Sequence, residues 1–361
     1  MLFKEKNLKL CSENPPCEKM STQIESDLYF ESEPFQQQLP HHYRSILSDF
    51  RKISKAFALF NGAFFFLGVL EIGIFIALFP WSFESAPFAI TLSILLLTLF
   101  SYLILLFHYV AKKPEQFQEL IQTFTSACLS SLQPFSTSHH LAIAQALRKL
   151  SLYLTDYEKE LFQISDRFPF INKIVSRCSA NVTWKDVFRF KEALLRAAIG
   201  QHLMQLRVSP TDLELHASLA NTYIALSQMY KAPKIEDAIW PHFYFYKKHQ
   251  TQFLEKFKTY GSLAIEEFQI LNDYAPNDPW IHEQLAAGYK ALSMPQEEIR
   301  EIELLLKLRP SDREVLFLLG NLYFQQGLNA KGLQIYEELK KIGFKKADHL
   351  LSTYTRSAER C

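Results

Sequence analysis

The chain has 361 residues, of which 39 are Lys or Arg and 38 are Asp or Glu, so its formal net charge is +1. This balance argues against a protein that binds nucleic acid by neutralising many phosphates. With only 10 Gly there is little material for phosphate-binding loops. The 5 cysteines are odd in number and form no CxxC pair, which argues against a disulfide framework and a zinc ribbon.

The first region, residues 1–55, mixes eight basic with eight acidic residues and shows no sustained hydrophobic periodicity. Such a composition buries too little apolar surface to offset the entropy of ordering the chain. We therefore expect residues 1–55 to form a mostly disordered tail that becomes helical near 41–55.

Two apolar runs follow, over residues 56–79 and 88–110. Asn61 and Glu71 interrupt the first run, and the second has only Thr, Ser, Tyr and one His as polar members. An α-helix needs about 20 apolar residues to cross the hydrocarbon of a bilayer. Buried helices of soluble proteins are the alternative, but these are usually shorter and amphipathic. The two runs predict a pair of membrane spans.

The connection between the runs, residues 80–87, contains no Lys or Arg. Basic residues instead flank the outer ends of the predicted transmembrane hairpin, residues 56–111: Arg44, Arg51, Lys52, Lys55, Lys112 and Lys113. Because basic flanks stay on the cytoplasmic side, we predict an integral membrane protein with two spans and both termini cytoplasmic. The paired spans with a very short turn resemble the bilobed hydrophobic domain of chlamydial inclusion membrane proteins. That resemblance implies, as an alternative, a secreted effector inserted in a host-derived membrane.

Glu71 places a carboxylate within the first span, where a charge is costly. One interpretation is a proton or ion relay, which makes the chain an oligomeric transport or channel subunit. The other is a hydrogen-bonded residue that holds the hairpin or an oligomer together, with Thr98 or Ser101 as its partner. The sequence offers no second intramembrane acidic residue, which favours the second interpretation.

Residues 115–210 are predicted to be helical, because apolar residues recur every three or four positions. They contain no clean repeat, and degenerate repeats are one interpretation of this region. A repeat appears in residues 211–346. Self-similarity at a fixed period is the signature of a repeat architecture. Three pairs of equivalent residues are each 34 positions apart: Ala286 and Gly320, Tyr289 and Tyr323, and Pro276 and Pro310.

The segment LFLLGNLY at 316–323 resembles the W-x2-L-G-x2-Y signature of the tetratricopeptide repeat, as does HEQLAAGY at 282–289. His282 stands where a large apolar residue is usual, and Glu298 where a small one is. The resemblance implies an all-α fold in which helix pairs stack into an α-solenoid. In such repeats a small residue lets the two helices approach, and the aromatic three residues later fills the gap beside it.

A third repeat is interrupted. HASLANTY at 216–223 has the first-helix pattern, but the second-helix pattern starts only at Ala264, which places an insertion near 230–260. Aromatic and basic residues interleave in this insertion. It is interpreted either as a surface for a partner or membrane, or as a loop and helix packed on their own solenoid, and the second is favoured. Residues 347–361 are predicted to form a capping helix over the last repeat.

No catalytic motif is complete. His282 and Glu283 begin an HExxH pattern, but its fifth residue is Ala286, so the second zinc ligand is missing. The sequence also contains no GxxxxGK, GxSxG or GxGxxG. We therefore expect no enzyme activity, no metal site and no cofactor.

Repeat helices line a groove with the side that they do not bury. Asn221 and Asn321 match the recurrent asparagine of the tetratricopeptide family, which by resemblance hydrogen-bonds the backbone of a bound peptide. The lysines with which chaperone-binding members hold a terminal carboxylate are absent at the matching positions. Further candidates for the groove are Glu283, Lys290, Phe317 and Phe324. Whether a partner or the terminal helix covers the two phenylalanines is left open.

These features predict a membrane-anchored scaffold that binds protein or peptide partners through the concave face of a cytoplasmic solenoid. The expected partners are proteins and the lipid bilayer, not nucleic acid. A homo-oligomer formed through the hairpin is a further expectation.

Overall fold

The computed structural model describes residues 33–78, 86–132, 139–155, 157–159, 161–162, 169–232 and 240–351. The regular elements in these ranges are all helices, as the all-α prediction requires. The chain divides into two compact units, residues 1–146 and 147–361, and each is described by itself.

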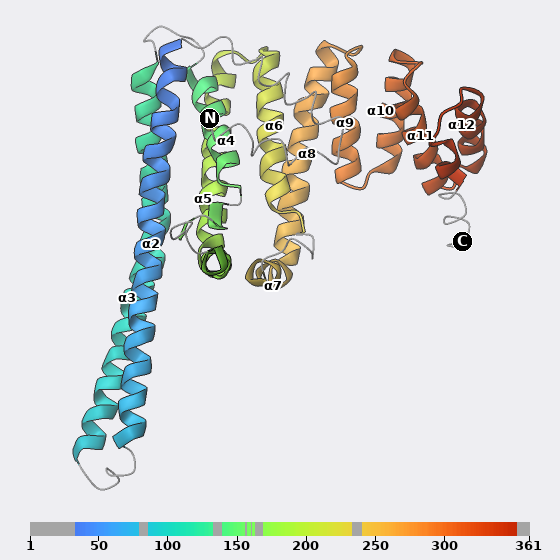
Figure 1. Cartoon of the computed structure of the whole chain (residues 1–361). Coiled ribbons are helices and arrows are strands. Elements are labelled where there is room, and N and C mark those ends of the chain that lie inside the picture. The colour runs from blue at the N-terminus through green and yellow to red at the C-terminus, as the bar shows by residue number, and fades with distance from the viewer. Residues whose placement is uncertain are drawn as a thin grey trace. The chain divides into compact units, whose positions relative to one another are not determined.

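The first unit is built on two antiparallel helices that lie side by side, α2 (Glu33–Leu78) and α3 (Ala86–Ser131) (Figure 1). Each has 46 residues. At about 1.5 Å per residue such a helix is about 70 Å long, roughly twice the thickness of bilayer hydrocarbon. Only about half of each helix is therefore needed to cross the hydrocarbon, and the other half extends beyond that length.

The half of the hairpin next to its two open ends is amphipathic. Its buried residues recur at intervals of three and four on both helices, which is the spacing of a helix-pair interface. They are Phe35, Leu39, Tyr43, Ile46 and Phe50 on α2, and Phe117, Ile121, Phe124 and Cys128 on α3. Tyr43 stacks on Phe124 with ring centroids 5.8 Å apart. We call this amphipathic half, residues 33–55 and 112–131, the stalk.

The expected boundaries at 55 and 111 do not separate elements. Helix α2 begins at Glu33, upstream of the expected start near 41, and continues without a break into the first apolar run. Helix α3 likewise continues past 111, with Pro114 inside it. The expected helical region 115–210 therefore starts within α3. The disorder expected for the tail concerns residues 1–32, which lie outside the described part of the chain.

Three helical elements follow the hairpin: α4 (His139–Tyr153), the short 3-10 helix η3 (Tyr157–Lys159) and α5 (Pro169–Val208). Helix α5 has 40 residues and packs against α6, the first helix of the repeats. These elements agree with the helical interpretation of the region before residue 210.

The repeats form three consecutive helix pairs, and the second helix of each of the first two pairs also packs against the first helix of the next pair. Asp212, Asp278 and Asp312 cap the first helix of the respective pairs. Asp212 and Asp312 each accept hydrogen bonds from two backbone amides of the first turn, and Asp278 accepts one, from Trp280. The pairs are α6 (Leu213–Met229) with α8 (Gln250–Tyr274), α9 (Pro279–Ala291) with α10 (Pro295–Leu308), and α11 (Arg313–Gln325) with α12 (Asn329–Lys341).

The insertion predicted near 230–260 packs on its own repeats. It forms α7 (Trp240–Lys248) and lengthens α8 at its N-terminal end. The ring centroids of Phe253 and Tyr230 are 5.4 Å apart. Phe245, Tyr246 and Phe257 pack against the same cluster. These aromatic side chains fill space between helices, which agrees with the favoured interpretation of the insertion.

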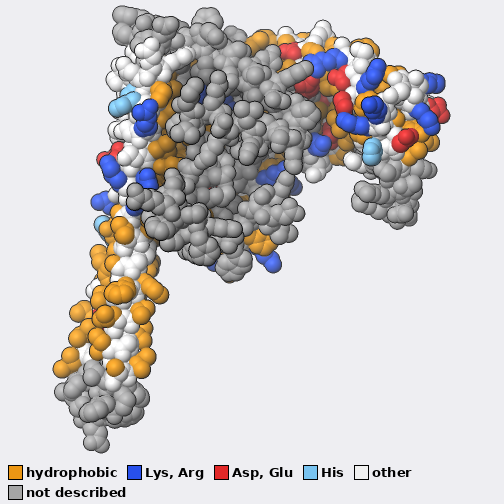
Figure 2. All heavy atoms as spheres, viewed as in Figure 1, with side chains coloured by type: hydrophobic (Ala, Val, Ile, Leu, Met, Phe, Trp, Pro, Cys, Tyr) orange, Lys and Arg blue, Asp and Glu red, His pale blue; other side chains and the backbone are white. Residues whose placement is uncertain are grey.

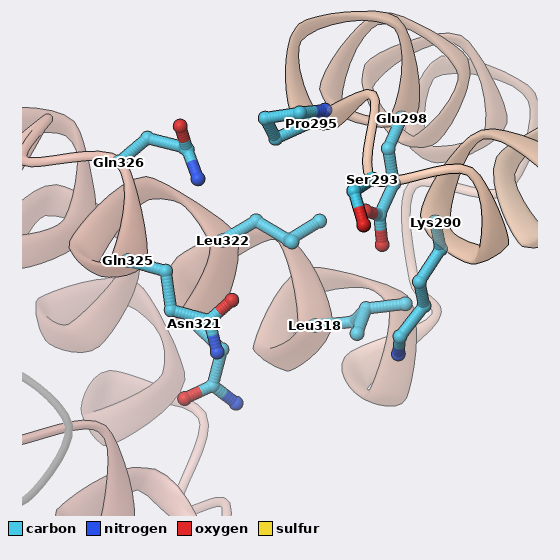
Figure 3. Close-up of a pocket in the computed structure, with 9 residues that line it drawn as sticks. All are labelled: Lys290, Ser293, Pro295, Glu298, Leu318, Asn321, Leu322, Gln325 and Gln326. Carbon is cyan, nitrogen blue, oxygen red and sulfur yellow. The ribbon is translucent and has the colours of Figure 1, made fainter. Parts of the chain in front are cut away.

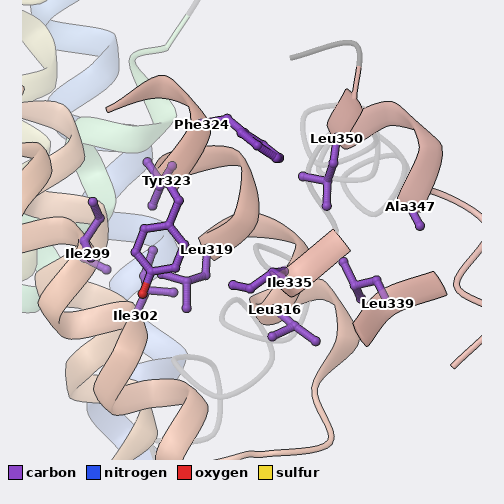
Figure 4. Packing of buried hydrophobic residues seen from close by; sticks show 12 residues of the cluster. Ile299, Ile302, Leu316, Leu319, Tyr323, Phe324, Ile335, Leu339, Ala347 and Leu350 are labelled. Atoms are coloured by element: carbon purple, nitrogen blue, oxygen red, sulfur yellow. The ribbon is translucent and has the colours of Figure 1, made fainter. Parts of the chain in front are cut away.

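The last pair packs Phe324, Ile335 and Leu350 in one buried cluster (Figure 4), and the glycines beside these side chains leave the space that they occupy. A Cβ atom at Gly332 would lie 2.7 Å from the ring of Phe324, and one at Gly320 would lie 3.0 Å from Ile335. The short helix at 347–351 covers this pair through two buried residues, Ala347 and Leu350. The rest of the predicted capping helix, residues 352–361, lies outside the described residues.

Candidate partner-binding site

A pocket of about 330 Å³ lies where the second pair meets the first helix of the third pair (Figure 3). Helix α9 contributes Lys290, α10 contributes Glu298, and α11 contributes Asn321. The structure thus brings together two of the predicted groove residues, Lys290 and Asn321. The remaining lining residues are Ser293, Pro295, Leu318, Leu322, Gln325 and Gln326.

Glu298 is the most unusual residue of the pocket. It is 5% exposed, and no hydrogen bond from a described residue reaches its carboxylate. Burial raises the pKa of the Glu298 carboxyl, and the charge of Lys290 acts in the opposite direction. In the sequence, Glu298 departs from the small residue that is usual at this position of the repeat. That departure alone does not predict a pocket.

The turn before α10 also shapes the pocket. Ser293 has φ of 59°, the left-handed region that side-chain-bearing residues seldom adopt. No sequence signal pointed to Ser293, since Gly or Asn would be the usual residue for that conformation. Gln325 and Gln326, at the end of α11, were missed as well because they lie outside the repeat signature.

The other predicted site residues lie elsewhere. Glu283 forms an ion pair with Arg309, with its Oε1 2.6 Å from Nη1 of the guanidinium. Phe317 is half-buried, and its ring lies 5.8 Å from that of Phe344, in the segment after α12. Asn221 is half-buried on α6 and does not line the pocket.

The prediction for Phe324 has to be corrected. Its exposed fraction is 0%, and it belongs to the core of the last pair together with Leu319 and Ile335. Gly332 leaves the space that its ring occupies. Phe324 therefore stabilises the fold and is not accessible to a partner.

Glu71 has a partner within the hairpin. The Thr98 hydroxyl donates a hydrogen bond of 2.7 Å to Glu71 Oε1. Thr98 is one of the two partners that the sequence predicts for Glu71. Closer to the stalk, the Tyr102 hydroxyl donates to Asn61 Oδ1 at 3.1 Å. Both bonds join α2 to α3. Among the described residues, no group of His, Cys, Asp or Glu is arranged to hold a metal ion.

The apolar half of the hairpin exposes its hydrophobic side chains. Figure 2 shows them along the described part of the hairpin beyond the stalk, whereas Lys and Arg appear on the stalk. Phe65 is 75% exposed and Phe107 is 71% exposed. Both helices are long and apolar enough to span a membrane, by length and composition. Contiguous apolar patches are rare on soluble monomers, and large ones mark surfaces that contact a membrane or another protein.

The chain matches no protein-family model and no curated protein at the level of sequence. Among solved structures, it is similar to a tetratricopeptide repeat protein from Parabacteroides merdae, with 12% identity over 64% of this chain and 80% of that chain, and a TM-score of 0.20. It is also similar to the P58(IPK) TPR domain, with 13% identity over 90% of this chain and 99% of that one, and a TM-score of 0.23. At TM-scores this low the likeness carries no argument about function, and the repeats rest on their own helix pairing and period.

Proposed function

We propose that this protein is a membrane-anchored scaffold whose helical repeats bind other proteins. The observation that carries the proposal is the change of surface along one continuous hairpin. In the stalk, hydrophobic residues face the partner helix, whereas in residues 56–77 and 89–110 they also point outward. Glu71 is the only Asp, Glu, Lys or Arg in those two ranges, and its carboxylate accepts a hydrogen bond.

The anchor is proposed to insert with both ends of the chain on the cytoplasmic side. The basic residues near 44–55 and 112–113 support this orientation through the positive-inside rule. A cysteine at Ser82, in a variant without native cysteines, tests it. An impermeant maleimide added to intact cells should label this cysteine at once, and a cysteine restored at Cys361 only after the membrane is opened. Labelling at Cys361 from outside overturns the orientation.

The partner surface is proposed to include the pocket at Lys290 and Asn321. Stacked helix pairs generate extended surfaces for protein binding, and this pocket is polar and open between two pairs. A photo-crosslinking amino acid at Asn321 tests the proposal in cells that express the full chain. We expect crosslinks to a discrete protein. Lys307, exposed on the second helix of its pair, is the matched control position.

Crosslinks of equal yield from Asn321 and Lys307 would mean that contact is non-specific, and the proposed surface would be wrong. Crosslinks from Asn321 that disappear with a bulky Leu322→Trp change, which fills the pocket, would support it. Leu322 is a buried residue of the pocket wall, so circular dichroism must first show that this variant keeps its helices.

A further inference from the structure

The aromatic helix of the insertion, α7, has an inner side and an outer side. On the inner side, the ring centroid of Phe245 lies 5.3 Å from that of Trp184 on α5. On the outer side, Tyr244 is 61% exposed, and the two lysines of the last turn, Lys247 and Lys248, are exposed as well. Residues three and four positions apart lie on one face of a helix, so these three side chains share an exposed face of α7.

Helix α5, which contacts α7, presents a similar face (Figure 1). Val182 is 53% exposed, Arg189 is exposed, and Lys185 between them is half-buried. Their spacing of three and four residues places them on one side of α5. The Lys185 Nζ lies 5.2 Å from the centroid of the Phe245 ring, so this lysine lies against α7. We call the six outer residues of the two helices the basic face: Val182, Lys185, Arg189, Tyr244, Lys247 and Lys248.

The cations of the basic face are close enough to act on one another. The pKa of Lys185 is lowered, first by its partial burial and then by the positive charges of Arg189 and Lys248. The carboxylate of Asp186 acts in the opposite direction, but this side chain is itself buried. Like charges that the fold holds together repel each other, and a negatively charged ligand relieves that repulsion.

Other acidic residues do not neutralise the basic face. Glu192, the next acid along α5, pairs with Arg196 and Lys256 instead. Within the part of the chain that the structure describes, none of the four cations of the basic face forms an ion pair. The complementary surface must therefore bring its own negative charge.

The two uncharged residues of the basic face narrow the choice of that surface. Tyrosine is enriched at membrane interfaces, where its ring lies at the level of the headgroups. Tyr244 and Val182 give the cationic surface an apolar part that can enter this layer. Clusters of lysine and arginine attract the anionic lipids of the cytoplasmic leaflet. Aromatic and aliphatic side chains among cations thus favour a lipid surface.

We propose that the basic face binds the anionic headgroups of the bilayer in which the hairpin is anchored. The inference rests on the proposed anchor, because the hairpin keeps a bilayer within reach of the repeats. It adds to the permanent anchor a second, reversible membrane contact, whose strength depends on lipid charge and ionic strength.

The test uses the full-length protein in proteoliposomes. An environment-sensitive NBD fluorophore is attached at Val182→Cys in a variant without native cysteines. Vesicles of phosphatidylcholine are compared with vesicles that also contain about 30% phosphatidylserine. We expect at least about twofold brighter and blue-shifted emission in the anionic vesicles, because the fluorophore enters the interface. The same fluorophore at Leu333→Cys, an exposed position on α12, is the control and should emit equally in both.

Charge variants and salt separate the basic face from general attraction. The test variant combines Lys185→Gln, Arg189→Gln, Lys247→Gln and Lys248→Gln. The control variant changes four exposed cations of the last two repeats and the segment after them: Lys307→Gln, Arg313→Gln, Lys341→Gln and Lys345→Gln. The test variant should lose the response to anionic vesicles, and the control variant should keep it. Salt at about 0.5 M should abolish the response of the unchanged chain, which needs no variant to fold.

The proposal is overturned by equal emission in the two kinds of vesicle. It is also overturned by a response that persists at high salt or in a test variant that keeps its helical circular dichroism. Polyaspartate, added to proteoliposomes of phosphatidylcholine, probes an acidic protein as the competing occupant. A response to polyaspartate without one to anionic vesicles would overturn the proposal as well.

Alkaline carbonate extraction of the same proteoliposomes reports on the anchor separately. If carbonate removes the chain but the fluorophore responds as described, the proposed anchor fails and the basic face stands. If the chain resists carbonate and the fluorophore does not distinguish the vesicles, the basic face fails and the anchor stands.

Discussion

The buried His282 and the partly buried Glu301 link the two helices of one repeat: the imidazole Nδ1 lies 2.7 Å from the carboxylate Oε2. The other ring nitrogen, Nε2, lies 2.9 Å from the carbonyl oxygen of Pro276. Each ring nitrogen thus lies within hydrogen-bond distance of an oxygen that can accept. The pair satisfies both ring nitrogens by fixing the first helix to the second helix and to the preceding turn.

The same arrangement occurs in the interrupted repeat. His216 Nδ1 lies 2.6 Å from Glu267 Oε2, and its Nε2 lies 3.0 Å from the carbonyl oxygen of Pro210. The third repeat carries Leu316 at the histidine position and Ile335 at the glutamate position, and both are buried. Histidine thus occurs with glutamate in two repeats, and leucine with isoleucine in the third, and we infer that the two positions act as a unit.

This unit predicts the outcome of exchanging one pair for the other. His282→Leu alone should lower the free energy of unfolding by about 1–3 kcal/mol, because it leaves the partly buried Glu301 without its donor. The double variant His282→Leu/Glu301→Ile should recover most of the loss, since the third repeat already packs this combination. Chemical denaturation of the full chain measures both, and a double variant no more stable than the single one would contradict the prediction.

The pair at His216 also predicts a dependence on pH. Burial by itself lowers the pKa of His216, but the hydrogen bonds to Glu267 and to the Pro210 carbonyl, with the charge of Glu267, outweigh it and raise the pKa above 6.5. The stabilisation is therefore complete below pH 6.5 and is lost as the pH rises through the pKa of the folded state. Unfolding free energy should fall between pH 6.5 and mildly alkaline pH, and this slope should be smaller in His216→Leu/Glu267→Ile.

Two glycines inside helices should respond in opposite directions to alanine. Gly332→Ala places a Cβ 2.7 Å from the buried ring of Phe324, so overpacking should lower stability by about 1–3 kcal/mol. Gly200→Ala meets nothing within 4 Å and should raise stability by about 0.5–1 kcal/mol through better helix propensity. Thermal unfolding followed by circular dichroism measures the stability change of each variant. A loss of stability in Gly200→Ala would show that this helix face is covered.

In the hairpin, Glu71 and Thr98 should be coupled. A double-mutant cycle with Glu71→Leu and Thr98→Val, followed by reversible unfolding in mixed micelles, is expected to give an interaction energy of about 0.6 kcal/mol, the usual size for hydrogen bonds between membrane helices. The pair Asn61→Leu and Thr98→Val is the control, because Asn61 bonds to Tyr102 and Thr98 bonds to Glu71. Equal coupling in both cycles would contradict a specific bond.

The 34-residue period was readable from the sequence because its positions are tied to packing. Small residues at 286 and 320 and aromatic residues at 289 and 323 occupy equivalent places, and the aspartates before each first helix act as caps. The apolar runs were readable for a similar reason, since a helix that exposes hydrophobic side chains on every side needs an unbroken apolar sequence. Local spacing is enough to predict such features.

Other features depended on contacts that spacing does not encode. The stalk has a clear pattern from Phe35 through Phe50, a segment with only two charged residues, but the composition of residues 1–55 taken as a whole hides it. Glu298 was noticed only as a departure from the repeat signature, because its pocket is made by residues from three helices. Phe324 was assigned to the groove from its helix position, and only the glycine on the facing helix explains its burial.

The uninterrupted course of α2 and α3 has a mechanical consequence. In the proposed orientation, about 23 residues of α2 project from the bilayer as an extension of the spanning helix, a lever of about 35 Å. Helices that are too long or too short for the surrounding lipid adjust by tilting. A tilt of about 10° would move the far end of the lever sideways by about 6 Å. A change in membrane thickness would thus be converted into a displacement at the cytoplasmic end of the stalk.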